Sequence, residues 1–470
     1  YGDQGGNDGG INKTYNNLYE PETAPGTADY DRVVMAYDGL RRPRLKTDQL
    51  EDTTAFVYDM ASRLKTKEFT AAVGSPNTAD SGKDDLFTYD KASRLLTANS
   101  ERYGNTVTMT YTADGLIASE NLRGNVSSNP AGYTLFRDYD ADDRLTLITY
   151  PNGSTVRRTY TDRNQLDKVF RDPDGPSGAE PEAELFDAEY DAAMRETART
   201  LGNGLTRTTS YGRADHLTTA MTVADPAAAS GGDRPGLSWS TYGYDANKNL
   251  DTATTLGVMA NYSFTTNQDA EDRLTQWDRT NGESQWFDLM LVGDWNETDG
   301  DRLVNGIMTS FSETRDHNAV HEITEIDPGG GAVALEHDAK GNLTLDEDGN
   351  TYEWDFDNRL MDVRNSNDDL LGSYTYDAFG RRTTKTVPGN FPGDPAVTTA
   401  FVCLTDNSGM GQQLTEYEDG MLMRLYTYGT YIDEPITMTR LDVNVPASQQ
   451  TTYYHRDRQY NLVGLTDITG

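Results

Sequence analysis

Short stretches in which polar and apolar residues alternate run through most of the chain. Residues 106–111 read Thr-Val-Thr-Met-Thr-Tyr, which places Val107, Met109 and Tyr111 on one face and the threonines on the other. A period of two residues is typical of a β-strand with one buried face. Residues 30–465 contain no sustained helical periodicity, so the pattern predicts an all-β chain.

Turn residues separate these stretches at short intervals. Residues 146–150 and 155–160 flank a Pro-Asn-Gly-Ser segment, and an Asn-Gly pair between two strands is a strong hairpin signal. Residues 343–345 and 351–354 flank an Asp-Gly-Asn segment in the same way. The sequence therefore predicts a series of β-hairpins.

One seven-residue pattern, Tyr-Asp-x-x-x-Arg-Leu, recurs along the chain. Full copies occupy residues 58–64, 89–95 and 139–145. Weaker or degenerate copies begin at Tyr37, Tyr111, Tyr160, Tyr190, Tyr211, Tyr244, Gln268, His337, Trp354 and Tyr376. From Tyr37 to Tyr244 the copies lie 21, 31, 22, 28, 21, 30, 21 and 33 residues apart. An interval of 21 residues accommodates two strands and two turns, so each repeat is interpreted as one hairpin.

The fixed positions of the repeat suit a joint between two strands. We expect the Tyr to end one strand, the Asp to form an Asx-turn, the Arg to pair with that Asp, and the Leu to begin the next strand. The predicted structural repeat positions are Tyr58, Asp59, Arg63, Leu64, Tyr89, Asp90, Arg94, Leu95, Tyr139, Asp140, Arg144, Leu145, Tyr376, Asp377 and Arg381.

Composition narrows the classes of function. The chain has 76 acidic and 41 basic residues, a formal charge of −35, which argues against a nucleic-acid partner or an anionic membrane surface. No stretch approaches the roughly 18–20 apolar residues of a membrane-spanning helix. Cys403 is the single cysteine, which excludes an internal disulfide and a thiolate zinc site. The 28 tyrosines and 43 glycines favour many half-exposed strands joined by tight turns.

No group of residues indicates catalysis or a bound cofactor. His317, His321 and Glu322 have ligand-like spacing, but they occupy the frame of a degenerate repeat and are interpreted as a turn. The acidic segments 296–301 and 346–350 do not follow the calcium-loop register, so weak Ca²⁺ binding is left open and no metal site is predicted. We expect a non-enzymatic protein without a cofactor, in which Cys403 acts as a small buried hydrophobic residue.

The repeat resembles that of the Rhs, or YD-repeat, family, which includes shells of bacterial polymorphic toxins, the toxin-complex cocoon and the extracellular part of teneurins. The resemblance extends from about residue 33 to residue 470. A more specific match lies near the carboxyl end. The family signature there is carried by Tyr428, Gly429, Ile432, Asp433, Glu434, Pro435, Tyr453, Tyr454, His455 and Asp457.

The resemblance implies a repetitive β-hairpin ribbon coiled into a spiral hollow shell or tube. We expect a Gly/Asn-rich arm at residues 1–30, the repeat array at 31–425 and an Rhs-core-like segment at 426–470. In the family, further YD repeats and a core-terminating Asp-Pro-x-Gly element normally follow such a segment, and in some members autoproteolysis and a toxin domain accompany it. Because the sequence opens on Tyr1 and stops at Gly470, we expect it to be a processed or excerpted piece.

Two hypotheses of function remain open from the sequence. The first is a secreted or surface-exposed bacterial shell that encapsulates or carries a cargo such as a toxin domain. The alternative is an extracellular filament or adhesin whose subunits join through open edge strands to neighbouring copies. Carbohydrate binding through exposed Tyr and Trp rings is compatible with either. Both hypotheses place the protein outside the cell or at its surface.

Overall fold

The computed structural model describes residues 13–16, 32–124, 131–176, 178, 180–225, 238–257, 262–389, 394–405, 411–430, 434–441 and 445–470. Strands dominate these residues, as the alternating Thr, Val and Tyr positions predict. Two helical segments occur among the described residues, η1 (Pro76–Asp80) and α1 (Ala447–Gln450). In the described part of the chain no helix has the length and apolar character needed to cross a membrane.

The strands follow one another with short connections. The first thirteen are β1 (Lys13–Asn16), β2 (Arg32–Tyr37), β3 (Pro43–Thr47), β4 (Thr53–Tyr58), β5 (Leu64–Thr70), β6 (Asp85–Tyr89), β7 (Leu95–Ser100), β8 (Asn105–Tyr111), β9 (Ile117–Gly124), β10 (Tyr133–Tyr139), β11 (Leu145–Thr149), β12 (Thr155–Tyr160) and β13 (Leu166–Asp172). The next thirteen are β14 (Ala183–Tyr190), β15 (Glu196–Leu201), β16 (Thr206–Tyr211), β17 (Thr218–Ala224), β18 (Ser238–Tyr244), β19 (Leu250–Gly257), β20 (Phe264–Gln268), β21 (Leu274–Arg279), β22 (Ser284–Leu289), β23 (Trp295–Val304), β24 (Ile307–His317), β25 (Ile323–Asp327) and β26 (Val333–Ala334). The last twelve are β27 (Glu336–His337), β28 (Leu343–Leu345), β29 (Thr351–Trp354), β30 (Leu360–Arg364), β31 (Leu370–Tyr376), β32 (Arg382–Val387), β33 (Val397–Thr405), β34 (Gly411–Glu418), β35 (Met421–Tyr428), β36 (Pro435–Arg440), β37 (Thr451–Arg456) and β38 (Leu462–Thr466).

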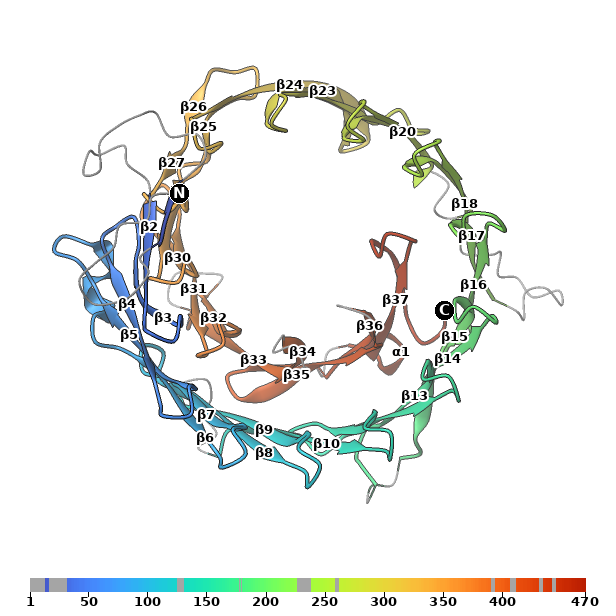
Figure 1. Ribbon diagram of the computed structural model, residues 1–470. Helices are drawn as coiled ribbons and strands as arrows, with labels where there is room; N and C mark the ends of the chain where they lie inside the picture. The colour runs from blue at the N-terminus through green and yellow to red at the C-terminus, as the bar shows by residue number, and fades with distance from the viewer. Residues whose placement is uncertain are drawn as a thin grey trace. The chain divides into compact units, whose positions relative to one another are not determined.

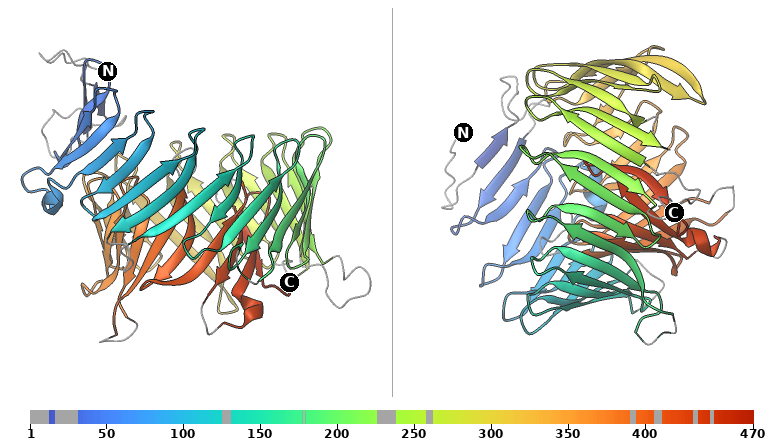
Figure 2. Two further views of the ribbon diagram at one scale, coloured as in Figure 1. Left: turned by 90° about the horizontal axis from the view of Figure 1, so that it is seen from below. Right: turned by 90° about the vertical axis from the view of Figure 1, so that its right-hand side faces the viewer.

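Neighbouring strands pair antiparallel, mostly in chain order. Strands β1 to β26 belong to one hydrogen-bonded sheet and β27 to β38 to a second. In the repeats the motif Tyr and Leu are cross-strand partners, as in Tyr58↔Leu64 and Tyr89↔Leu95, and the register shifts just before the Tyr. Figure 2 shows consecutive strands of this kind side by side, for example β12 to β17 in green. The predicted all-β ribbon of antiparallel hairpins is confirmed.

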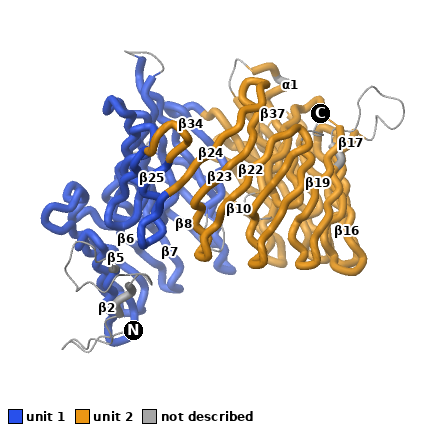
Figure 3. Tube along the Cα trace, turned by 90° about the horizontal axis from the view of Figure 1, so that it is seen from above, with its two compact units in different colours: residues 1–135, 316–326, 333–421 blue, residues 136–315, 327–332, 422–470 orange. Residues whose placement is uncertain are grey.

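The chain divides into two compact units (Figure 3). Unit 1 contains residues 1–135, 316–326 and 333–421, and unit 2 contains residues 136–315, 327–332 and 422–470. Each unit combines an early part of the chain with a late part. The sequence instead predicts consecutive segments, with boundaries at residues 30/31 and 425/426. These segments are defined along the chain and not by contacts, and they stay a prediction.

Unit 1 has two layers of strands. Strand β33 lies against β9, and the two are distant in sequence but adjacent in Figure 1. Its core includes Val107, Met109 and Leu122, with Phe379 from the late part of the chain packed against them. Alternating residues of the early hairpins therefore become buried because the late hairpins cover one of their faces.

Unit 2 has the same arrangement over part of its length. Strand β36 contacts β14, and buried side chains on β12 to β17 include Val156, Val169 and Phe186. Within residues 264–315, in contrast, Thr298 is the one buried residue that the structure describes. Strands β20 to β24 therefore keep the hairpin pattern while burying very little on either face.

Candidate functional site: repeated turn, layer contacts and a cationic hollow

The repeated turn is built around one carboxylate. Asp59 Oδ1 accepts hydrogen bonds from the backbone N–H groups of Ala61 and Arg63, at 2.8 and 3.0 Å. Asp59 Oδ2 accepts a bond from Arg63 Nε at 2.6 Å. Ser62, the fourth residue of the turn, has a φ of 64°, in the left-handed region. The Asp thus satisfies the N–H groups that the tight bend leaves unpaired.

Most of the other described repeats have the same geometry. The Asp and Arg four residues later form a short ion pair at Asp38–Arg42, Asp90–Arg94, Asp140–Arg144, Asp191–Arg195, Asp269–Arg273, Asp355–Arg359 and Asp377–Arg381. The side-chain hydrogen bond from Arg63 is the largest cause that lowers the pKa of Asp59, and Arg42 does the same for Asp38. The carboxylate of the turn is therefore held in its charged form.

Each turn also connects to the next repeat. The guanidinium carbon of Arg63 lies 4.8 Å from the centre of the Tyr89 ring, and the Tyr89 hydroxyl donates to the carbonyl of Leu64 at 2.9 Å. Arg94 and Tyr111 repeat this contact, with the Tyr111 hydroxyl donating to the carbonyl of Leu95. Burial raises the pKa of Tyr89 and of Tyr111. Successive copies of the motif are therefore linked, turn to turn, in a ladder along one edge of the ribbon.

In unit 1 late copies of the motif join the two layers. The Tyr103 hydroxyl donates to Asp355 Oδ2 at 2.8 Å, and the ring of Phe356 stacks on Phe69 with centres 4.2 Å apart. Burial raises the pKa of Tyr103 far above its ordinary value, with the Asp355 charge as a further cause. Arg102 lies over the Phe356 ring, 5.2 Å from its centre. This contact joins two parts of the chain more than 250 residues apart.

A second contact of unit 1 centres on Arg381. Its Nη1 donates to Glu120 Oε1 at 2.8 Å while its Nε donates to Asp377 Oδ2 at 2.6 Å. Glu120 also accepts from the backbone N–H and the hydroxyl of Thr405. Glu120 is 2% exposed and Asp377 1% exposed. Two buried carboxylates thus share one guanidinium across the layers.

In unit 2 the corresponding contact uses a residue of the family signature. Arg199 Nη2 lies 2.6 Å from Glu434 Oε1 and 2.6 Å from Glu196 Oε2. Arg207 adds a second guanidinium to Glu196. Burial opposes the charge of Glu196, but Arg199 and Arg207 outweigh it and lower its pKa. A glutamate of the sequence signature thereby connects the late segment to β15 and β16.

The other signature positions have varied surroundings. The carbonyl of Tyr428 accepts from Arg158, and the backbone N–H of Gly429 donates to the carbonyl of Glu434. Pro435 begins β36, opposite Tyr428 in the β35–β36 pairing. Ile432 and Asp433 lie outside the described residues. The functional importance of the signature positions stays a prediction.

Strand β37 carries the remaining signature residues. Tyr453 is buried, and its hydroxyl lies close to Gly202, where an added Cβ would be 2.6 Å from it. Tyr454 pairs with Leu465 of β38. The ring of His455 hydrogen-bonds to Thr466, and burial together with Arg207 lowers the pKa of His455 to about 4. Asp457 forms an Asx-turn with Gln459 and Asn461.

The residues with other candidate chemistry lie in turns or in the sheet. His321 occupies the positive-φ position of the turn that begins at Asn318. Asp346 accepts from Asp348 and Asn350 as a repeat-type turn. Burial raises the pKa of Cys403 to about 11, so the thiol is unreactive at neutral pH. Among the residues that the structure describes, no three His, Cys, Asp or Glu residues gather in a way that would hold a metal ion.

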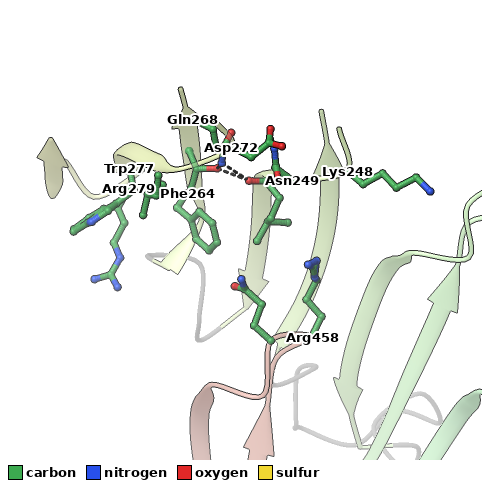
Figure 4. A pocket seen from close by; sticks show the side chains of 12 residues that line it. Lys248, Asn249, Phe264, Gln268, Asp272, Trp277, Arg279 and Arg458 are labelled. Carbon is green, nitrogen blue, oxygen red and sulfur yellow. Dashed lines mark hydrogen bonds between the residues drawn. The ribbon is translucent and has the colours of Figure 1, made fainter. Parts of the chain in front are cut away.

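A hollow that the sequence did not predict lies in unit 2. Its main part, about 540 Å³, is lined by β19, β20 and β21 and by the turn between β37 and β38. An adjoining part of about 330 Å³ shares Phe264 and Arg279 with it. Figure 4 shows Arg458 extending from the β37–β38 turn toward the strand that carries Asn249, with Phe264 and Trp277 on the other side. Lys248 lies at the rim and points away from the centre.

Only a weak signal in the sequence points to this hollow. Arg456 and Arg458 are two residues apart in a strongly acidic chain, and Lys248 stands in a repeat turn. Nothing in the spacing brings them together, because the two segments are some 200 residues apart. The folding of the late hairpin onto β18–β21 creates the site.

Comparison with known proteins relates this fold to solved toxin complexes. A chain of a Photorhabdus luminescens Tc holotoxin pore matches with a TM-score of 0.68 at 13% identity, over 94% of this chain and 23% of that one. A chain of TcdB2-TccC3 matches with a TM-score of 0.65 at 12% identity, over 94% of this chain and 24% of its own length. TcdB2-TccC3 without its hypervariable C-terminal region gives 0.64 at 13% identity, over 94% of this chain and 23% of that one. No protein-family model and no curated protein matches the chain.

These matches show the fold of the chain. At 13% identity nearly the whole chain superimposes on Tc toxin chains, so the resemblance to Rhs/YD-repeat proteins predicted from the Tyr-Asp motif is confirmed as a resemblance of fold. The chain spans about a quarter of the length of the solved chains that it matches.

Proposed function

We propose that the chain is a non-enzymatic wall segment of an Rhs/YD-type β-shell that encloses a polypeptide cargo, such as a toxin domain, outside the producing cell or at its surface. The observation that carries this proposal is the match of 94% of the chain to Tc toxin chains. The wall acts sterically: where strands are hydrogen-bonded side by side, a folded protease cannot pass between them.

The construction of each unit supports a wall. Hairpins joined by the Asp–Arg ladder form a sheet one strand thick, and the late hairpins double it in unit 1 at Arg381 and in unit 2 at Arg199. Such a wall needs little apolar residue per chain, in agreement with a hydrophobic content of 35%. The acidic surface keeps wall segments soluble.

Cryo-electron microscopy of the purified chain tests the proposal. We expect discrete particles whose class averages show a ribbon curving around an unfilled space. Long fibres with a repeat of one chain would instead favour the filament or adhesin, whose subunits join at strand edges. Compact particles without an internal space would contradict both.

A further inference from the structure

The contact between the early and the late layer of unit 2 contains two arginines without a counter-charge. Arg199 and Arg207 at this contact are paired with carboxylates. Arg158 and Arg171, in contrast, form no ion pair within the part of the chain that the structure describes. The described residues of unit 2 therefore leave the positive charge of these two guanidinium groups unbalanced.

The two arginines lie on the same face of the early layer. In the β12–β13 register Arg158 is opposite Val169, which is two residues before Arg171, so the two arginines are diagonal neighbours. Such positions are about 7–8 Å apart, within reach of long side chains. Both guanidinium groups also touch the late layer: Arg158 Nη2 donates to the carbonyl of Tyr428 at 2.9 Å, and Arg171 Nη1 donates to the hydroxyl of Thr439.

The phenol of Tyr150 lies near both guanidinium groups. Burial raises the pKa of Tyr150 to about 12, and the charges of Arg171 and Arg158 act in the opposite direction. Burial also lowers the pKa of Arg171. The Tyr150 hydroxyl donates to the carbonyl of Tyr426 at 2.7 Å. Because a phenol is neutral at physiological pH, Tyr150 marks the place where the two positive charges meet and does not balance them.

Two buried polar atoms at this contact have no hydrogen-bond partner among the described residues. One is Nε of Arg158, a residue that is 7% exposed, and the other is Oγ1 of Thr437, which is 1% exposed. Thr437 is two residues from Thr439 on β36, so it shares the face that Arg171 contacts. An N–H and an O–H that lack an acceptor suit an anion, which accepts hydrogen bonds from both.

Water and proton loss do not solve the charge imbalance. Arginine stays protonated in proteins, so neither guanidinium group becomes neutral on burial. A buried water molecule can accept from the unpaired donors, but it brings no negative charge. Burying a charge without a counter-ion is strongly unfavourable. Because the two unpaired atoms are also closed to solvent, the counter-ion must be small.

We propose that this contact binds a small inorganic anion, with chloride as the abundant representative, held by Arg158, Arg171 and the hydroxyl of Thr437. The anion joins β12 and β13 to β36, so the packing of the two layers of unit 2 depends on it. This binding site goes beyond the enclosure of a cargo, and it uses residues of unit 2 alone.

Hydrogen exchange and thermal unfolding of the full chain test the proposal, with sodium chloride replacing sodium gluconate at constant ionic strength. Constant ionic strength keeps the screening of the acidic surface equal in all samples. We expect the unfolding midpoint to rise with chloride and then to level off, and bromide to act as chloride does. Exchange of the β36 amides should slow about tenfold when chloride is about ten times its dissociation constant.

Two substitutions should remove this response for different reasons. Arg158→Met deletes one cation, and chloride should then slow exchange by about twofold or less. Thr437→Asp supplies a carboxylate beside the guanidinium groups, so β36 should stay protected without chloride. Arg157→Met is the matched control, because Arg157 is the next residue on β12 and pairs with Glu182 on the opposite face. It should respond to chloride as the parent does.

Three results would overturn the proposal. Equal exchange and equal midpoints in chloride and gluconate would show that no anion binds. An unchanged response in Arg158→Met would place the anion elsewhere, and so would a full response in Thr437→Asp. If Arg158→Met fails to fold, crystals of the parent chain soaked in bromide decide. An anomalous peak beside Arg158 and Arg171 supports the proposal, and the absence of a peak there contradicts it.

Discussion

The same motif occurs in unit 1 with two different surroundings. Asp59–Arg63 lies in an early hairpin, and its two side chains are 23% and 25% exposed. Asp377–Arg381 lies in a late hairpin, where the values are 1% and 11%. The hydrogen bond from Arg Nε to Asp Oδ2 is 2.6 Å long in both. The two Asp–Arg turns therefore have the same local geometry but differ in their exposure to solvent.

This difference decides what the motif contributes. An exposed ion pair contributes about 0–1 kcal/mol because water screens it. At Arg381 the ion pair is buried, and the guanidinium also neutralises Glu120 of the other layer. A turn residue of the repeat has thus become the contact that joins two layers, and losing it leaves buried charges without a partner.

The largest expected effect follows from this contrast. Arg381→Gln should lower the free energy of unfolding of unit 1 by about 3–5 kcal/mol, because Glu120 and Asp377 would remain buried without their cation. Arg63→Gln should lower it by about 1 kcal/mol or less. Urea denaturation, with hydrogen exchange of β8 and β9 as the local probe, measures both. Equal effects of the two substitutions would show that burial does not distinguish the two turns.

A similar contrast applies to the aromatic residues. Phe356 is 4% exposed and stacked on Phe69, so Phe356→Ala should cost about 3 kcal/mol or more. Phe136 is 52% exposed, and Phe136→Ala should change stability by less than about 0.5 kcal/mol. Thermal melts of the two variants make the comparison. A small loss at Phe356 would mean that the layers hardly depend on this stack.

Acidification should act on the two units with opposite sign. Burial and Arg207 lower the pKa of His455 to about 4. Between pH ~6.5 and ~4 the imidazole of His455 therefore binds a proton in the unfolded state but not in folded unit 2. This costs unit 2 about 3 kcal/mol over that window. Burial raises the pKa of Asp85 to about 6, so folded unit 1 takes up its proton first and gains stability as the pH falls from about 6 to 4.

Amide protection factors separate these two responses. Protection of β37 should fall and that of β6 should rise as the pH is lowered toward about 4.5, above the range in which the turn carboxylates titrate. His455→Gln should abolish the first change and Asp85→Asn the second. A change of the same sign in both strands would contradict the assignment.

The smallest expected effect concerns a turn that lacks its Asp. At residues 290–294 the backbone bonds of the repeat are present, Met290 N–H to Asp294 O at 2.8 Å and Gly293 N–H to Met290 O at 2.9 Å. Met290 stands where the Asp normally is, so no carboxylate accepts the N–H groups of the bend. Asp294 stands where the Arg normally is, and the turn with an acid at that position, Asn365 to Asp369, begins with Asn. Met290→Asn should therefore raise stability by about 0.5–1 kcal/mol, seen as a higher thermal midpoint. A lower midpoint would show that the side-chain oxygen is not what stabilises these turns.

The turns were the most predictable part of the molecule. An Asp followed four residues later by Arg, with a small or glycine residue between, specifies hydrogen bonds within five residues, and these are the bonds found at Asp59 and Asp90. The partners of Glu120 and of Tyr103 were not predictable. Each lies more than 250 residues away, and nothing in the local pattern indicates which late hairpin will cover which early one.

The sequence by itself determined the hairpins, because strand alternation and turn chemistry are satisfied between near neighbours. Only the tertiary structure decided which faces are buried, which copies of the motif join layers, and that Arg456, Arg458 and Lys248 surround one hollow. Those outcomes depend on solvent exclusion, which changes the free energy of an ion pair or a ring contact far more than its geometry does. Exclusion of solvent requires a second layer of chain, and a repeat does not encode the place where that layer lies.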